Sequence, residues 1–278
     1  MQVAEHIAAL RAEGPLLASA AEQGGPDAVV PACPGWRMRD LVRHVGSVHR
    51  WATGYVAAQQ TSPAGSPGEA EMLRAGPPDD KDLPGWFLDG LQRLIDALER
   101  ADPAMTCWTF LAAASPLAFW ARRQAHETAI HRADARLAAG IGLTPFPPGL
   151  ARDGIDELIM GFGGRASKRG LRADPPCWLA VHAAPGPAAT APGQRDAGSV
   201  GPGDWLVRMA PDSASVARGT VPDAEAATVP ERGGCALTGP AESLYLLLWN
   251  RGGTEGVDLR GDPRGLRLWR ERMHVRWA

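Results

Sequence analysis

The chain has few of the features that mark several large classes of protein. Only two of its 278 residues are lysines, and the formal net charge is −2 despite many arginines. Nucleic-acid binding proteins need an excess of basic side chains to neutralise phosphates, so we expect no nucleic-acid partner. No run of about 18 apolar residues occurs, and therefore no membrane-spanning helix is expected.

Cysteine is also scarce. The four cysteines are widely spaced, without a C-x-x-C pair: Cys33, Cys107, Cys177 and Cys235. This spacing does not indicate a disulfide framework. Charged residues within the first 13 positions interrupt any apolar segment of the kind found in signal peptides. These absences together favour a reducing, cytoplasmic location.

The remaining composition is that of an ordinary globular protein. Hydrophobic residues make up 45% of the chain and charged residues 22%. Apolar positions recur at helical spacing in four segments, which predicts helices over 2–23, 36–59, 85–101 and 116–139. Gly14-Pro15 is expected to bend or restart the first helix, and Gly140 to end the fourth. The polar, proline-rich segment 61–84 is predicted to be a loop.

The pattern changes after about residue 150. Short alternating or apolar runs predict strands at 177–182, 204–209, 234–238 and 256–260, with a helix over 240–250 and a loop over 183–203. The predicted fold class is therefore a two-domain α+β protein. Residues 1–150 would form a four-helix bundle and residues 151–278 a small α+β domain.

Glu127 and His131 are the first candidate site residues. They lie four positions apart in a predicted helix, so both side chains face the same way and can bind one divalent cation. His126 is five positions from His131, about 140° around the helix, and cannot easily share that cation. The spacing His-Glu-x-x-x-His also differs from the zinc-protease motif, which favours Glu127 as a ligand over a general base.

A third ligand could come from the second predicted helix, which contains His44 and His49. These two are five positions apart, so we expect only one to face inward, and periodicity does not choose between them. Three protein ligands with an open fourth position are what a catalytic zinc site requires.

Two segments resemble the mycothiol-dependent maleylpyruvate isomerase family, a group of DinB-like metal-binding four-helix bundles. The first runs from Cys33-Pro-Gly-Trp36 to His44, and the second is His126-Glu-Thr-Ala-Ile-His-Arg-Ala-Asp134. The runs at 203–208 and 246–252 are similar to parts of that family's C-terminal α+β domain. The resemblance thus extends over nearly the whole chain.

The resemblance implies a zinc ion, or another divalent metal, held by His44, Glu127 and His131. It also implies mycothiol as a low-molecular-weight thiol cosubstrate, and isomerisation or thiol transfer on a small, carboxylate-bearing electrophile. Arg251 matches the position of an arginine that would hold the substrate, although it could simply cap a helix. Arg123, one turn before Glu127, is a second candidate for binding substrate or cofactor.

Some alternatives stay open. Asp134 could orient His131, or it could pair with Arg132 or Arg136 on the surface. A metal-dependent enzyme of secondary metabolism that uses zinc, iron or nickel without mycothiol has the same ligand types. A non-catalytic binding protein with a residual or structural metal site is also compatible. Nothing in the sequence identifies the substrate.

Overall fold

The computed structural model describes residues 1–63, 71, 74–77, 79–184, 203–218 and 234–275. The described chain forms two compact units, which divide between Thr144 and Pro145. We expected the boundary after residue 150, which falls inside the helix α6 (Pro148–Asp156) and is six residues later than the observed division. Among the described residues, no helix is long and apolar enough to cross a membrane.

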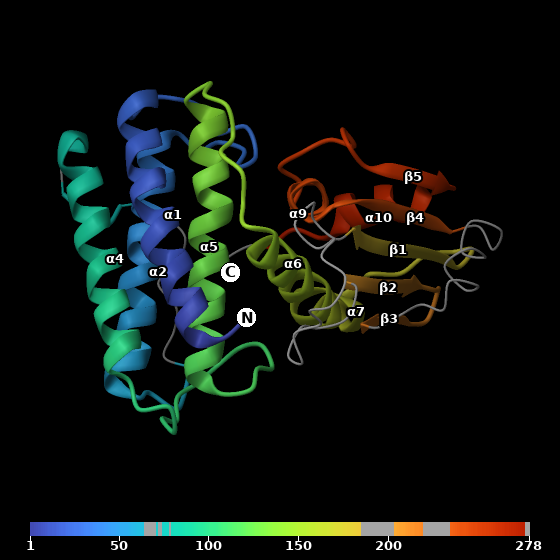
Figure 1. Cartoon of the computed structure of the whole chain (residues 1–278), viewed down its shortest axis with the longest axis horizontal. Coiled ribbons are helices and arrows are strands. Elements are labelled where there is room, and N and C mark those ends of the chain that lie inside the picture. Colours follow the sequence, from blue (N-terminus) through green and yellow to red (C-terminus); the bar gives the residue numbers. More distant parts are fainter. Residues whose placement is uncertain (64–70, 72–73, 78, 185–202, 219–233, 276–278) are drawn as a thin grey trace, which may run out of the picture. The chain divides into compact units, whose positions relative to one another are not determined.

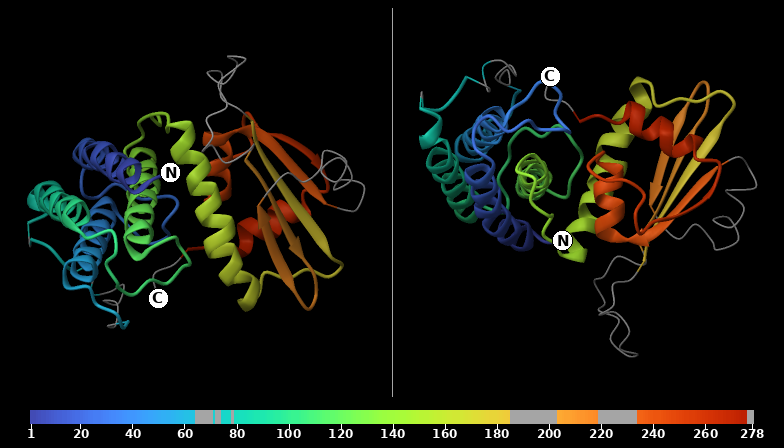
Figure 2. Two further views of the ribbon diagram at one scale, coloured as in Figure 1. Left: turned by 60° about the horizontal axis from the view of Figure 1, so that its bottom comes forward. Right: turned by 90° about the horizontal axis from the view of Figure 1, so that it is seen from above.

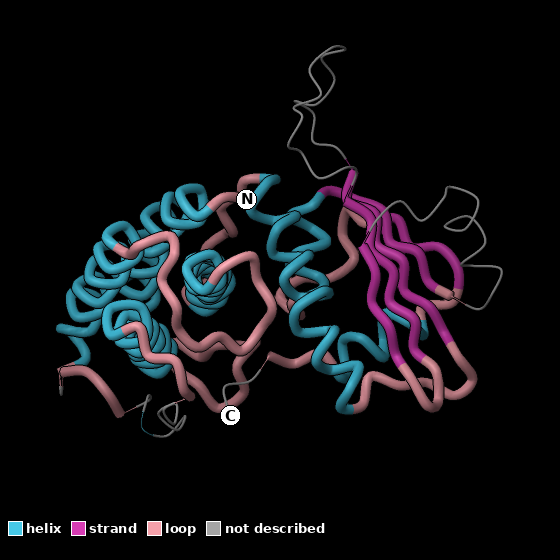
Figure 3. Tube along the Cα trace, turned by 90° about the horizontal axis from the view of Figure 1, so that it is seen from below, coloured by secondary structure: helices cyan, strands magenta, loops and turns pink. Residues whose placement is uncertain are grey.

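The N-terminal unit is a bundle of four long helices (Figures 1 and 3). They are α1 (Val3–Gly24), α2 (Met38–Ala58), α4 (Leu83–Arg100) and α5 (Pro116–Ala138). Each matches a helix predicted from hydrophobic spacing. The predicted loop at 61–84 lies partly outside the described residues, and its end is helical: Asp80–Asp82 forms the 3₁₀ turn η1. The helix α1 packs on α4 and α5, and α2 does the same.

Local chemistry fixes the ends of α5, the helix that carries Glu127 and His131. The Ser115 hydroxyl accepts a hydrogen bond from the amide of Ala118 at 3.1 Å, and Pro116 occupies the first turn. Both features favour a helix start, because the first amides of a helix lack partners within it. Gly140 has a φ of +67°, so a glycine just beyond the last turn terminates the helix as predicted.

The helix α1 runs without interruption through Pro15, so the restart expected as one of two alternatives at Gly14-Pro15 does not occur. Gly14 is buried against Leu91 of α4, and a side chain there would collide with it. The glycine therefore permits close approach of two helices instead of a turn.

The C-terminal unit contains a five-stranded mixed sheet in the order β3-β2-β1-β4-β5. The strands are β1 (Cys177–Ala184), β2 (Gly203–Met209), β3 (Ala214–Arg218), β4 (Cys235–Pro240) and β5 (Asp258–Gly261). Strands β1 and β4 are parallel, and the other neighbours are antiparallel. Leu179 and Val181 of β1 are buried, whereas Trp178 and His182 are partly exposed.

Helices cover the buried face of this sheet (Figure 2). They are α6, the π-helical segment η2 (Glu157–Gly163), α7 (Gly164–Arg169), α9 (Ala241–Leu248) and α10 (Arg264–Arg272). The predicted fold class is confirmed, as are α9 and four of the strands. The predictions omitted β3, α10 and the helical run from 148 to 169, where five glycines obscure the helical pattern. The loop expected at 183–203 lies mainly outside the described residues.

Candidate metal centre

Three buried side chains converge at the centre of the helix bundle. His44 comes from α2, and Glu127 and His131 come from α5; their exposed fractions are 1%, 3% and 8%. His44 Nε2 lies 3.1 Å from Glu127 Oε1, and His131 Nε2 lies 3.3 Å from the same oxygen. Two imidazole nitrogens and one carboxylate oxygen therefore face a common point.

This arrangement fits a tetrahedral divalent cation. Zinc binds imidazole nitrogen and carboxylate oxygen at about 2.0–2.2 Å, which places neighbouring ligand atoms about 3.3 Å apart. The two separations at Glu127 Oε1 are close to this value, and the three donor atoms all lie within 4.8 Å of one another. The ligand types suit zinc and several other first-row metals.

An arginine holds the second oxygen of the carboxylate. Arg123 Nη2 donates to Glu127 Oε2 at 2.8 Å, and the arginine is only 1% exposed. Arg123 lies one turn before Glu127, as predicted. We expected it to bind substrate or cofactor, whereas in the structure its guanidinium binds the candidate metal ligand Glu127. The arginine thus orients the carboxylate so that Oε1 faces the two histidines.

The protonation states of the centre are strongly coupled. Burial alone would raise the pKa of Glu127, but the charge of His131 and the hydrogen bonds from both histidines hold this pKa well below its usual range. Burial alone would lower the pKa of His131, yet Glu127 and Asp134 together raise it to about 9. Without a metal, the centre is therefore a buried ion pair, and a cation would replace the proton between His131 and Glu127.

Asp134 contacts the other nitrogen of the same imidazole. His131 Nδ1 lies 2.9 Å from Asp134 Oδ2, and Asp134 is fully buried. Of the two alternatives for Asp134, this contact favours orientation of His131 over a surface ion pair. Arg132 is engaged elsewhere, since its Nε donates to Glu13 at 2.6 Å.

The prediction that only one of His44 and His49 faces inward was wrong. His49 is also fully buried, because α2 contacts two helices and has two inward directions. The hydroxyl of Thr128 donates to the Gln124 carbonyl at 2.8 Å, so its oxygen accepts from His49 Nε2 at 2.9 Å. Burial lowers the pKa of His49 to about 3, and the side chain is a neutral hydrogen-bond donor to Thr128.

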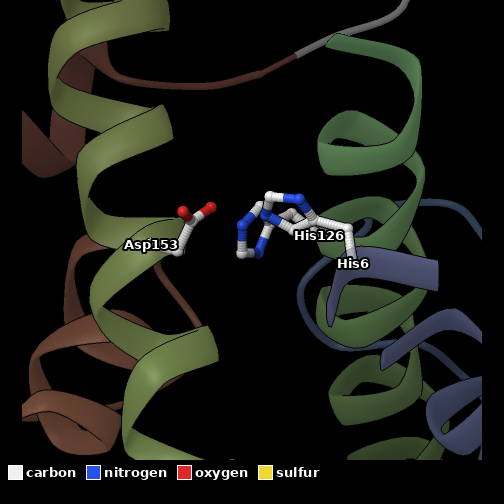
Figure 4. Close-up of side chains that lie close together, drawn as sticks. All are labelled: His6, His126 and Asp153. Carbon is white, nitrogen blue, oxygen red and sulfur yellow. The ribbon is translucent and has the colours of Figure 1, made fainter. Parts of the chain in front are cut away.

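His126 faces away from the centre, as the helical period predicts. Its ring packs edge-on against His6 of α1, with 6.1 Å between ring centroids (Figure 4). Both histidines are buried within the bundle.

Arg251 lies in the C-terminal unit, just after α9. Its Nη1 donates to the Trp249 carbonyl at 2.8 Å, and its amide donates to Leu246 at the same distance. The first contact is one that a helix-capping arginine makes. A role for Arg251 in binding substrate stays a prediction.

Comparison with known proteins finds a family match for the N-terminal unit and structures with a similar fold for the chain. Residues 7–136 match the model of the mycothiol maleylpyruvate isomerase N-terminal domain. Two solved structures share the fold of the whole chain: the crystal structure of the mycothiol-dependent maleylpyruvate isomerase, and that of a histidine-to-alanine mutant of this enzyme. Each is 13% identical, covers 93% of either chain and has a TM-score of 0.59. No curated protein sequence matches this chain.

The fold is thus a helix bundle, with a buried His–Glu–His cluster, followed by an α+β unit of the same kind as in those structures. The N-terminal unit belongs to the mycothiol maleylpyruvate isomerase N-terminal domain family. The family resemblance seen in the sequence is confirmed for this unit, and the fold for the whole chain.

Proposed function

We propose that this protein is a metal-dependent enzyme that uses a low-molecular-weight thiol, with mycothiol as the preferred one. The metal, zinc or a similar divalent ion, would be held by His44, Glu127 and His131. The reaction would be cis–trans isomerisation, or thiol transfer, on a small electrophile that carries a carboxylate.

The convergence of two histidines on one carboxylate oxygen is the observation that carries this proposal. Arg123 already binds and neutralises Oε2 of the buried Glu127 carboxylate. Two imidazole nitrogens at Oε1 complete a His–Glu–His set of the kind that binds zinc. Their convergence is explained if a cation binds between the three ligand atoms.

The bound metal would stabilise a thiolate over a thiol, which supplies a sulfur nucleophile at neutral pH. In an isomerisation, this sulfur adds to a cis double bond conjugated with a carbonyl, and the negative charge moves to the carbonyl oxygen. Rotation about the new single bond and loss of the thiolate restore the double bond in the trans geometry. The thiol is regenerated, and no oxidant or reductant is consumed.

The residues of this chain would orient the reacting groups. Arg123 fixes the carboxylate plane of Glu127, and all three candidate ligands are buried from bulk water. Arg251 would bind a substrate carboxylate, since a guanidinium can form two parallel hydrogen bonds to it.

Metal analysis of untagged protein, combined with mycothiol titration by calorimetry, tests this function. We expect about one divalent ion per chain, and thiol binding that depends on it. His44→Ala and Glu127→Ala should abolish both, whereas His49→Ala, which removes an equally buried imidazole from the same helix, should abolish neither.

Activity on maleylpyruvate, followed by the absorbance of the conjugated substrate, tests the reaction class. Thiol binding that survives His44→Ala and Glu127→Ala unchanged would disprove a metal-bound thiol. A metal-loaded protein that binds no thiol would instead favour a metal enzyme that activates water.

A further inference from the structure

The segment Cys33–Trp36 forms a tight turn beside the metal centre. The amide of Trp36 donates to the Cys33 carbonyl at 3.0 Å, and Gly35 has a φ of +87°. Proline followed by a glycine at positive φ is the pattern of a type II turn. The Cys33 amide donates to Val30 and the Val30 amide to Trp36, so both ends of the turn are tied to Val30.

The turn places Trp36 against two of the three candidate ligands. The indole centroid lies 4.8 Å from the His44 ring and 6.4 Å from the His131 ring. The planes of Trp36 and His131 differ by only 25°, which is a stacked arrangement. The indole therefore lies beside the rings of both candidate ligands.

The same turn places Cys33 against the residue that holds His131 from behind. Cys33 Sγ lies 3.9 Å from Asp134 Oδ2, the oxygen that also contacts His131 Nδ1 at 2.9 Å. A hydrogen bond from Nδ1–H to this carboxylate leaves the lone pair of the neutral imidazole on Nε2, which faces Glu127. One buried carboxylate therefore links the turn to the tautomer of a metal ligand.

We propose that the Cys33–Trp36 turn and Asp134 form a clamp that positions His131 for metal binding. Trp36 holds the plane of the ring, and Asp134 holds its tautomer and rotation. Cys33 holds Asp134 in turn. All are positioning residues, and the proposal rests on the metal centre of the proposed function.

Cobalt(II) binding to the metal-free full-length chain provides the test, because its visible spectrum reports ligand type and geometry. Asp134→Ala should weaken cobalt and zinc affinity by about 10–100-fold, the usual effect of removing such a residue. Asp134→Asn keeps an oxygen that accepts from Nδ1–H, so it should restore part of this loss. Cys33→Ala should weaken binding less than Asp134→Ala.

Gly35→Ala tests the turn itself with a matched control. A methyl group at Gly35 would have no atom within 4 Å, and the same is true at Gly140, which also has a positive φ. Each substitution strains the backbone without a collision, at a similar cost in stability. We expect only Gly35→Ala to weaken metal affinity and to change the cobalt spectrum, whereas Gly140→Ala should leave both unaltered.

The outcomes separate this proposal from the function on which it rests. Wild-type protein that binds no divalent ion would overturn the metal centre and the clamp together. Normal affinity and spectra in Asp134→Ala and Gly35→Ala, with a wild type that does bind, would overturn the clamp alone. An intense near-ultraviolet thiolate band that disappears in Cys33→Ala would also overturn it. That band would show that Cys33, His131 and Asp134, whose ligand atoms lie within 4.8 Å of one another, bind the ion themselves.

Discussion

Helix α5 has two buried polar faces that use the same residue types in different ways. On one face, Arg132 Nε donates to Glu13 Oε2 at 2.6 Å and its Nη1 donates to the Thr144 carbonyl at 2.7 Å. On the other face, Glu127 receives Arg123 on one oxygen and two histidines on the other. The first face joins one carboxylate to one cation. The second adds two imidazoles to the carboxylate and the arginine, and imidazole nitrogens are also metal ligands.

This difference separates a structural ion pair from a candidate metal site. A buried carboxylate and a guanidinium neutralise each other and need no further ion. A carboxylate with an arginine and two imidazoles has spare nitrogen ligands for a divalent cation. We therefore expect added metal to stabilise the cluster around Glu127 and to leave the Arg132–Glu13 ion pair unaffected.

Removal of Arg132 should have the largest effect on stability. Arg132→Ala leaves the Glu13 carboxylate buried without its guanidinium partner, which typically costs about 3–5 kcal/mol of unfolding free energy. We expect this loss in urea denaturation both with and without zinc. Recovery of the lost stability on addition of zinc would contradict the assignment of this face as structural.

Zinc itself should stabilise the wild-type chain by about 2.7 kcal/mol at a free concentration of 100 times its Kd. Thermal unfolding before and after chelation measures this difference. The stabilisation should vanish in His44→Ala and persist in His49→Ala. An equal response of both variants would show that the ion binds elsewhere.

Removal of Arg123 should have a smaller effect than removal of Arg132. In Arg123→Ala, the two histidines still donate to Glu127, so the carboxylate keeps partners. We expect a loss of about 1–3 kcal/mol in the metal-free protein, and a partial recovery when zinc is added. Urea denaturation of both arginine variants, each with and without zinc, gives the comparison directly.

Substitution of Glu13 by glutamine should be the mildest change. Burial raises the pKa of Glu13 despite the nearby charge of Arg132, so the folded protein retains this proton to a higher pH than the unfolded chain does. The contribution of this group to stability is therefore present at low pH and declines as pH rises from the ordinary pKa toward the raised one. Glu13→Gln should cost about 1 kcal/mol at neutral pH and remove this decline.

Denaturant unfolding between about pH 4 and pH 8 tests that prediction, because this interval begins near the ordinary pKa of a glutamate side chain and extends above it. If the free energy of unfolding depends on pH in the same way for the wild type and for Glu13→Gln, the prediction is contradicted. The same series on Arg132→Ala should show a stronger decline, because the arginine charge no longer opposes the effect of burial.

Local sequence features were sufficient to predict much of the bundle. Hydrophobic spacing located all four long helices, and the i, i+4 spacing placed Glu127 and His131 on one face. These features depend only on the helical period. The same logic failed for residues 148–169, where glycines masked a helical run that packs against α9 and the sheet.

The sequence by itself determined the four long helices, four of the five strands and the shared face of Glu127 and His131 on α5, because each depends on residues close together in the chain. Only the tertiary structure decided that His44 meets Glu127 across 83 positions of the chain, and that the equally buried His49 instead meets Thr128. The two histidines point in different directions from α2, and packing against α4 and α5 buries both. Packing likewise set the Cys33–Trp36 turn beside His131. Contacts between distant segments depend on how helices pack, which the period of a single helix does not specify.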